Sequence, residues 1–229
     1  MKKNVYTMIV MVWAVASLLL PTAWAHQPRL VGSQTEIKVS LPEVSKAYYG
    51  QLDGTPVIYH IETDTDFRLY VNILVPDIEG IDKDISVKIF RQGTVISHLD
   101  GSNHEWEPFF EPFAGDAYFR GPEYNQMQGP GSYEVQIFSP DNQGKYALAI
   151  GNQESFPFGE LVKTYLVLPR LKSEFFGKSP FSAYSNRMGM FLGILLLMGL
   201  VLAAVLYVMI RMIRKRLKRS NPIASQTVS

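Results

Sequence analysis

The feature that most constrains this chain is an uncharged run of twenty-three residues, Met188 to Ile210. At about 1.5 Å of rise per residue this run covers ~35 Å as a helix, more than the ~30 Å hydrocarbon core of a bilayer. The buried helix of a globular interior rarely needs so long a stretch without charge. We therefore predict one transmembrane helix over 188–210, with the lipid bilayer as a partner.

The charges that flank the run predict its orientation. Six Lys and Arg residues lie between Arg211 and Arg219, whereas the preceding flank offers Lys178 and Arg187. Because positive charge beside a span is retained in the cytoplasm, residues 211–229 should form a basic cytoplasmic tail. The chain would then be a single-pass cell-membrane protein with its N-terminal part outside.

Residues 1–25 have the three parts of a secretory signal peptide. A basic start precedes an apolar segment from Val5 to Leu20, and Ala23 and Ala25 stand where signal peptidase requires small residues. An uncleaved signal anchor is the alternative, but sixteen residues span only roughly 24 Å as a helix. Cleavage after Ala25 would make His26 the first residue of the exported chain.

Composition limits the chemistry of the outer segment, 26–187. It holds fourteen of the 22 Lys and Arg residues and all 21 Asp and Glu residues, which gives it a formal charge of about −7. This acidic balance argues against nucleic acid as a partner, since Lys and Arg drive phosphate binding. The chain has no cysteine, which excludes thiolate catalysis, iron–sulfur clusters and Cys-ligated zinc.

Short runs of alternating apolar and polar residues predict a β-fold over 26–152. Runs rich in β-branched and aromatic residues predict strands, and two of them flank the turn-rich segment Ser139 to Gly144, which predicts a hairpin. Eight short strands favour an all-β, jelly-roll-like β-sandwich, with its two sheets facing each other. The predicted strands are 37–41, 47–52, 57–62, 67–75, 85–90, 94–99, 133–138 and 146–150.

Two segments depart from this rhythm. Asp100 to Pro130 mixes aromatic and acidic residues with Gly and Pro, so we expect an irregular connection that serves either as a lid on the sandwich or as a binding surface. Glu160 to Leu168 fits a short helix that Pro169 interrupts or kinks before Phe176. Residues 153–187 should thus form a juxtamembrane helical stalk. Its aromatic collar at headgroup level would consist of Phe175, Phe176, Phe181 and Tyr184.

Several of these strands carry a resemblance to a known family. Tyr48-Tyr49-Gly50, the strand ending in Pro76-Asp77, and Gly131-Ser132-Tyr133-Glu134-Val135 followed by Tyr146-Ala147-Leu148 resemble bacterial pre-peptidase C-terminal domains, over about residues 45–151. That likeness implies a secreted, jelly-roll-like sandwich. His26 to Arg29 and Ser139 to Tyr146 are also similar to segments of archaeal and bacterial single-span membrane proteins, which implies anchoring but no particular activity.

Catalytic motifs are missing from the sequence, so we expect no enzyme. His104-Glu105 is followed by Pro108 at the position where a zinc-protease helix needs its second histidine. The sequence has no Gly-x-Ser-x-Gly elbow and no Gly-rich phosphate loop. Paired acidic residues between Asp100 and Glu123 would suit glycoside hydrolysis, but acidic loops are more often simply solvated.

Metal binding is the chemical alternative. As an N-terminal residue His26 could chelate copper through its amino and imidazole nitrogens, with His104 as the best second imidazole. The loop residues Asp77, Glu79, Asp82 and Asp84 offer oxygen ligands for calcium, although a charged loop that caps a sheet edge is the simpler interpretation.

These observations predict a membrane-anchored extracytoplasmic binding or structural module. The alternatives are a metal-binding exported domain and an accessory subunit of a membrane complex, which would contact another membrane or surface protein. Gly189 and Gly193 have the small-xxx-small spacing of helix pairs, which predicts a homodimer.

Overall fold

A computed structural model describes residues 26–112 and 114–220 of the 229-residue chain. The chain divides into two compact units at Met188, and each is described by itself. The first unit contains all eleven strands of the described residues, and the second consists of most of one long helix. Predictions for 1–25 and 221–229 lie outside the described residues.

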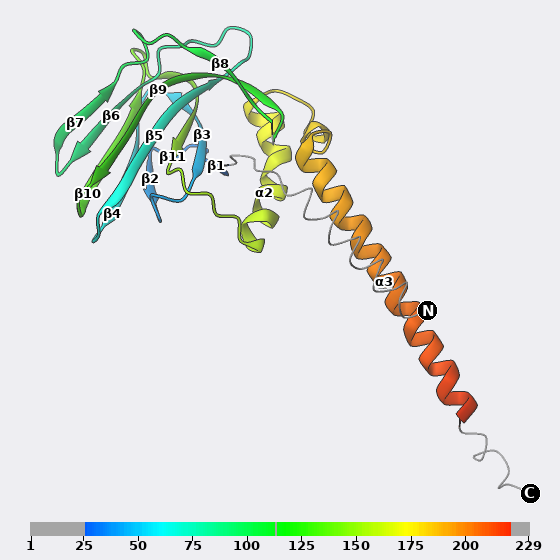
Figure 1. Cartoon of the computed structure of the whole chain (residues 1–229). Helices are drawn as coiled ribbons and strands as arrows, with labels where there is room; N and C mark the ends of the chain where they lie inside the picture. The colour runs from blue at the N-terminus through cyan, green and yellow to red at the C-terminus, as the bar shows by residue number, and fades with distance from the viewer. Residues whose placement is uncertain (1–25, 113, 221–229) are drawn as a thin grey trace, which may run out of the picture. The chain divides into compact units, whose positions relative to one another are not determined.

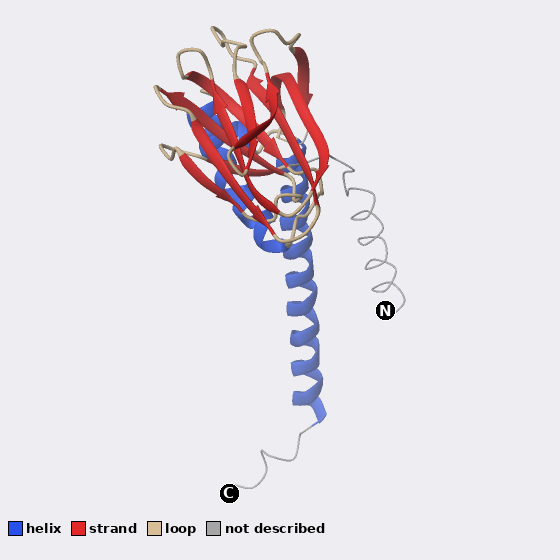
Figure 2. Ribbon diagram, turned by 90° about the vertical axis from the view of Figure 1, so that its left-hand side faces the viewer, coloured by secondary structure: helices blue, strands red, loops and turns tan. Residues whose placement is uncertain are grey.

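The strands form two sheets that face each other, which confirms the predicted all-β sandwich (Figures 1 and 2). Neighbouring strands are antiparallel except for the pairs β1–β3 and β2–β4. In spatial order, the six-stranded sheet contains β1 (Gln27–Leu30), β3 (Lys46–Asp53), β11 (Gln143–Ile150), β5 (Phe67–Pro76), β9 (Asp116–Gln128) and β8 (Glu107–Glu111). The five-stranded sheet contains β2 (Glu36–Val39), β4 (Val57–Thr63), β10 (Gly131–Phe138), β6 (Ser86–Arg91) and β7 (Thr94–Leu99).

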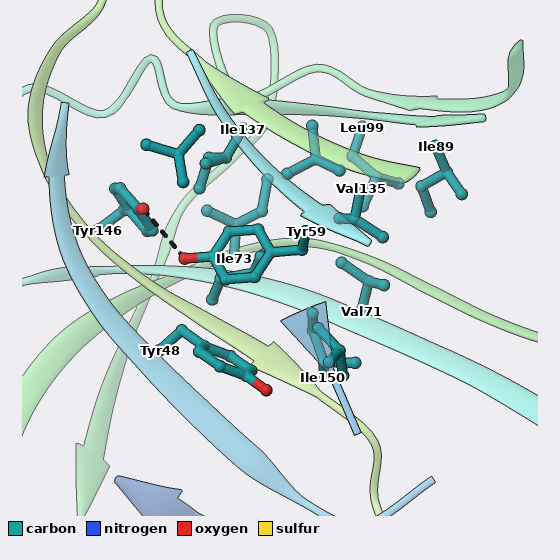
Figure 3. Close-up of a cluster of buried hydrophobic side chains, with 14 of the residues drawn as sticks. Tyr48, Tyr59, Val71, Ile73, Ile89, Leu99, Val135, Ile137, Tyr146 and Ile150 are labelled. Atoms are coloured by element: carbon teal, nitrogen blue, oxygen red, sulfur yellow. Dashed lines mark hydrogen bonds between the residues drawn. The ribbon is translucent and has the colours of Figure 1, made fainter. Parts of the chain in front are cut away.

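The core lies between the two sheets (Figure 3). It is built from the side chains at every second position of each strand, which point inward. Tyr59 of β4 and Tyr146 of β11 are fully buried, and their hydroxyls form a hydrogen bond of 3.0 Å across the core. Because buried hydroxyls need partners, each tyrosine satisfies the other. The contact joins the two sheets through the core.

The predicted hairpin between 133–138 and 146–150 is wrong. The two strands form as β10 and β11, but β10 pairs with β4 and β6, whereas β11 pairs with β3 and β5 in the other sheet. The Ser139 hydroxyl donates to the Gln143 carbonyl and accepts from its N–H, which shapes a turn that takes the chain across the core. Alternation along each strand marks one buried face, but it does not tell whether two strands share a sheet.

The segment 100–130 is also more regular than predicted. Most of it forms β8 and the thirteen-residue β9, which pair with each other, and β9 also pairs with β5. Trp106 lies over Gly121, and its indole N–H donates to the carbonyl of Gly101 at 2.8 Å. Among the described residues, the irregular parts of this segment are limited to 100–106, to 112 and 114–115 of the turn between β8 and β9, and to 129–130.

The helical segment forms as predicted, but it is not a stalk. Helix α2 (Phe158–Arg170) contains Pro169 and continues as a π-helical turn, η1 (Leu171–Phe175), followed by the 3-10 turn η2 (Pro180–Ala183). Leu168, Leu171, Phe175 and Phe176 are all buried, so this segment packs on the sandwich and belongs to the same compact unit. Phe175 and Phe176 accordingly do not form part of an exposed collar, whereas Phe181 is 81% exposed.

Burial along the central strands explains where the helical segment packs. Residues Val71–Pro76 of β5 and Tyr146–Ile150 of β11 are buried without alternation, which requires cover on both faces of the sheet. The other sheet covers the inner face. The outer face carries Leu74, Ala147 and Ala149, and the contacts described below place η1 on this side.

The second unit contains helix α3, which runs from Arg187 to Ser220. Its segment Leu196–Lys215 is long and apolar enough to cross a membrane, with a mean hydropathy of 2.4. This supports the prediction of a membrane-spanning helix. The candidate span in the helix, Leu196–Lys215, begins later than the predicted range 188–210. The space beside Gly193 is open, and pairing of two copies through Gly189 and Gly193 stays a prediction.

Candidate functional site at the helix–sheet junction

Among the described residues, the most deeply buried charged side chain, that of Asp116, lies where η1 meets the start of β9. We call this region the helix–sheet junction and define it by the residues that converge there: Tyr49, Ala114, Asp116, Tyr118, Lys172, Phe175, Phe176, Lys178 and Asn186. These residues come from β3, from the β8–β9 hairpin and from the helical segment.

Asp116 is the centre of the junction. Its carboxylate is fully buried and accepts a hydrogen bond from Lys172 Nζ at 2.6 Å on one oxygen and from Lys178 Nζ at 3.0 Å on the other. Lys172 is also buried, and it donates a second bond to the Ala114 carbonyl at 2.6 Å. A buried carboxylate needs such partners because its desolvation costs several kcal/mol.

Aromatic rings surround this charge. The Phe176 ring makes an edge contact with Tyr118 at 5.5 Å, and the Phe175 ring makes one with Tyr49 at 5.2 Å. Burial raises the pKa of Tyr49 and also that of Tyr118, and the two hydroxyls lie 3.3 Å apart. Asp116 is fully buried beside these rings, and a less polar environment strengthens its ion pairs.

Further contacts attach both ends of the helical segment to the sandwich. Near its start, Arg29 of β1 pairs with Glu160 of α2 at 2.7 Å. Along η1, Lys145 of β11 donates to the carbonyl of Phe175 at 2.7 Å. At its end, the Asn186 amide donates to the Ala114 carbonyl at 2.6 Å. The arrangement is a clamp that fixes 158–186 against one face of the sheet.

The sequence gives one weak signal for this site. Lys172 follows Leu171 and lies three residues ahead of the Phe175-Phe176 pair, so it has apolar neighbours on the helix and, if buried, would require an acidic partner. Neither Lys172 nor its burial was predicted from the sequence, and Lys178 was assigned only to the flank of the span. No spacing rule identifies Asp116 as that partner, since the two residues are 56 positions apart.

His26 and His104 are not brought together. His26 directly precedes β1 and His104 lies ahead of β8, and these strands are opposite edges of the six-stranded sheet. Five strand spacings of about 4.8 Å separate the edges by roughly 24 Å. A copper site shared by these two imidazoles is therefore not supported.

The imidazole of His26 already has a partner. Its Nδ1 forms a hydrogen bond with the Ser45 hydroxyl, and burial lowers the pKa of His26 to about 4. Nδ1 is the ring nitrogen close enough to the residue's own amino group to close a chelate ring. Copper binding through His26, which stays a prediction, would therefore have to break the bond to Ser45.

The four acidic residues predicted for calcium lie between β5 and β6, where Asp77, Glu79 and Asp82 are exposed. The described residues contain no group of three or more His, Asp or Glu side chains arranged to hold a metal ion. Asp84 differs from its neighbours, because its Oδ1 is buried without a hydrogen-bond partner. Burial and the nearby charge of Asp82 raise the pKa of Asp84.

The structure defines this molecule as a β-sandwich followed by a candidate membrane helix. No protein-family model matches the chain, and no curated protein matches it. The chain is similar to the pre-peptidase C-terminal domain of a collagenase from Bacillus anthracis, with 11% identity over 51% of this chain and 94% of that one, at a TM-score of 0.33.

Two further solved structures are similar at the same level. They are the CBM35 of Abf62 from Cellvibrio japonicus (13% identity, 44% of this chain and 68% of that one, TM-score 0.27) and the catalytic domain of a GH87 α-1,3-glucanase (12%, 52% and 27%, TM-score 0.26). The predicted family resemblance is matched only in sandwich class, and the likeness to single-span membrane proteins stays a prediction.

Proposed function

We propose that the chain is a membrane-anchored extracytoplasmic module that binds or supports another component at the cell surface. The observation that carries this proposal is the bond between Asn186 and Ala114, which ties the sandwich to the chain two residues ahead of the uncharged run 188–210. Helix α3 supplies the candidate span. The basic residues after it favour a cytoplasmic C-terminus.

The proposal is tested by extraction and protease protection of the full chain with a C-terminal epitope tag. We expect the protein to stay in the membrane pellet after alkaline carbonate. External protease should remove the sandwich from intact spheroplasts and leave the tag protected. Release by carbonate would refute anchoring, and loss of the tag from intact spheroplasts would refute the orientation.

A supporting role requires that the sandwich is held firmly. The clamp at the helix–sheet junction meets this requirement, since Asp116 and Arg29 fix the helical segment at two separate points. Chemical cross-linking in membranes, followed by mass spectrometry, would identify a protein partner if the module is an accessory subunit.

A further inference from the structure

The helical segment carries apolar side chains on the side that is not packed on the sandwich. Val162, Tyr165 and Leu166 are spaced i, i+3 and i+4 along α2, so they share one face of that helix. The Tyr165 and Tyr184 rings lie 5.1 Å apart, which joins this face to the end of η2. We call this surface the α2–η2 patch. Its exposed fractions are 43% for Val162, 38% for Tyr165, 65% for Leu166, 81% for Phe181 and 37% for Tyr184.

The patch does not have the pattern of an ordinary solvated helix face. Single exposed apolar residues are normal on a soluble domain, but a contiguous group marks a contact surface. Two of its members are tyrosines, whose rings combine an apolar body with a polar hydroxyl. Such side chains are enriched at the level of lipid headgroups.

The position of the patch in the chain identifies what can cover it. Tyr184 is four residues ahead of Met188, the first residue of the uncharged run. Four residues extend over at most about 14 Å. The headgroup region on one side of a bilayer is ~5–8 Å thick, so a bilayer crossed by this run lies within reach of Tyr184.

The clamp prevents the patch from separating from the sandwich. Ala183 is fully buried, and Asn186 is bound to the Ala114 carbonyl. Lys172 and Lys178, on either side of the Phe175-Phe176 pair, are both bound to Asp116. The patch is therefore a fixed surface of the folded domain, close to the residue where the uncharged run starts.

We propose that the α2–η2 patch lies in the headgroup region of the membrane that α3 crosses, so that the sandwich is docked on lipid and is not suspended on a free stalk. This inference rests on the anchoring proposed above. Leu166 and Phe181, the two most exposed members, should be the most deeply inserted side chains, and Tyr165 and Tyr184 should lie at the polar boundary.

The test uses tryptophan fluorescence of the full chain, purified and reconstituted into phosphatidylcholine vesicles with spin-labelled lipids. The variant Phe181→Trp places the reporter on the patch. The control Val95→Trp places it on β7, at the edge of the five-stranded sheet, where Val95 is 50% exposed and outside the patch. The native tryptophans Trp13, Trp24 and Trp106 contribute the same background to both variants, whether or not the predicted signal peptide 1–25 has been removed.

We expect labels near the headgroup to quench the reporter at position 181 at least about twofold more than the reporter at position 95, as for a side chain at the interface. Equal quenching would overturn the docking. A blue-shifted emission from position 181 that depends on protein density but not on labelled lipid would overturn it in favour of a second copy of the chain.

Flotation of the same vesicles separates failure of the docking from failure of the anchoring. If the protein floats with lipid after carbonate treatment but position 181 is not quenched, only the docking is wrong. If the protein does not float, the proposed anchoring is wrong as well. Leu166→Asp, in the Phe181→Trp background, should reduce the quenching and leave flotation unchanged.

Discussion

The Nζ of Lys172 lies 2.6 Å from a carboxylate oxygen of Asp116, and neither side chain is accessible to water. The two residues are 56 positions apart and belong to the helical segment and to the first position of β9. Lys178 occupies the other carboxylate oxygen. This relationship makes the helical segment part of the domain.

Removing one member of this cluster should be strongly destabilising. We expect Asp116→Ala to lower the free energy of unfolding by about 3–5 kcal/mol, since it leaves the Lys172 ammonium buried without its counter-ion. Urea denaturation of the full chain in detergent, followed by near-UV circular dichroism, measures the change. The control is Lys38→Ala, which breaks the exposed pair with Glu62 (78% and 70% exposed) and should cost less than about 1 kcal/mol.

A similar loss in both variants would contradict the central role of Asp116. Lys178→Ala gives a graded comparison, because Lys178 is 42% exposed and its site can be filled by water. We expect its effect to lie between those of Asp116→Ala and Lys38→Ala.

The contact between Trp106 and Gly121 should tolerate no additional atom. A Cβ at position 121 would lie 2.6 Å from the indole ring and 3.1 Å from the Ile73 carbonyl oxygen. We therefore expect Gly121→Ala to destabilise the fold by about 1–3 kcal/mol and to move Trp106. The measurements are urea denaturation and the indole emission maximum; Gly159→Ala, where the space is open, is the control. An unchanged emission maximum in Gly121→Ala would refute the contact.

Stability should decline at alkaline pH because of the buried tyrosines. Burial raises the pKa of Tyr146 to about 12 from its ordinary value of 10, so the unfolded chain releases this proton first. The stability that the neutral Tyr146 phenol contributes to the fold is fully present below pH 10 and is lost as the pH rises from 10 through about 12. Melting temperatures between pH 8 and 12 measure the decline.

Tyr146→Phe is the matched variant for this pH dependence. It leaves the Tyr59 hydroxyl without its partner, so we expect a loss of about 1–3 kcal/mol at pH 8. The decline between pH 10 and 12 should be shallower than in the parent. An equally steep decline would assign the pH dependence to other groups, such as Tyr48, whose pKa burial also raises to about 12.

Replacing the Asp84 carboxyl group with an amide should stabilise the fold. Because its pKa is raised in the folded state, ionisation of Asp84 reduces stability as the pH rises through that pKa, and the penalty persists at pH 7. We expect Asp84→Asn to raise the free energy of unfolding at pH 7 by up to about 1 kcal/mol in a chelating buffer. Asp77→Asn, at an exposed position, should have no effect.

The same variants test the sequence-based calcium prediction. If calcium binds through Asp77, Glu79, Asp82 and Asp84, adding it should raise the melting temperature of the parent and should have a smaller effect on both Asp77→Asn and Asp84→Asn. A parent that does not respond to calcium would rule out this site.

Much of the fold could be read from local patterns. Alternation identified eight strands, and Glu160–Leu168 with Pro169 identified the helix and its irregular continuation, because side-chain periodicity and proline act within a few residues. Three strands were not predicted. The edge strands β1 and β8 are too short to show a clear alternation of apolar and polar residues. Strand β9 does not show one either, because Gly, Pro and charged residues lie among its aromatic residues.

The candidate site could not be found in the same way. His26 and His104 were selected because histidine is a common metal ligand, yet they lie at opposite edges of one sheet. Asp116 was one acidic residue among several in 100–130. Its importance comes from burial beneath Lys172, and burial depends on which distant segment packs above it.

The sequence by itself determined the uncharged run, the alternating strands and the helix that Pro169 interrupts, since each is a property of neighbouring residues. The tertiary structure alone decided that β10 and β11 belong to different sheets and that Lys172 meets Asp116. It also decided that the helical segment is a clamped part of the domain. Strand partners and buried ion pairs are chosen by the packing of the whole chain, in which residues far apart in sequence compete for the same buried space.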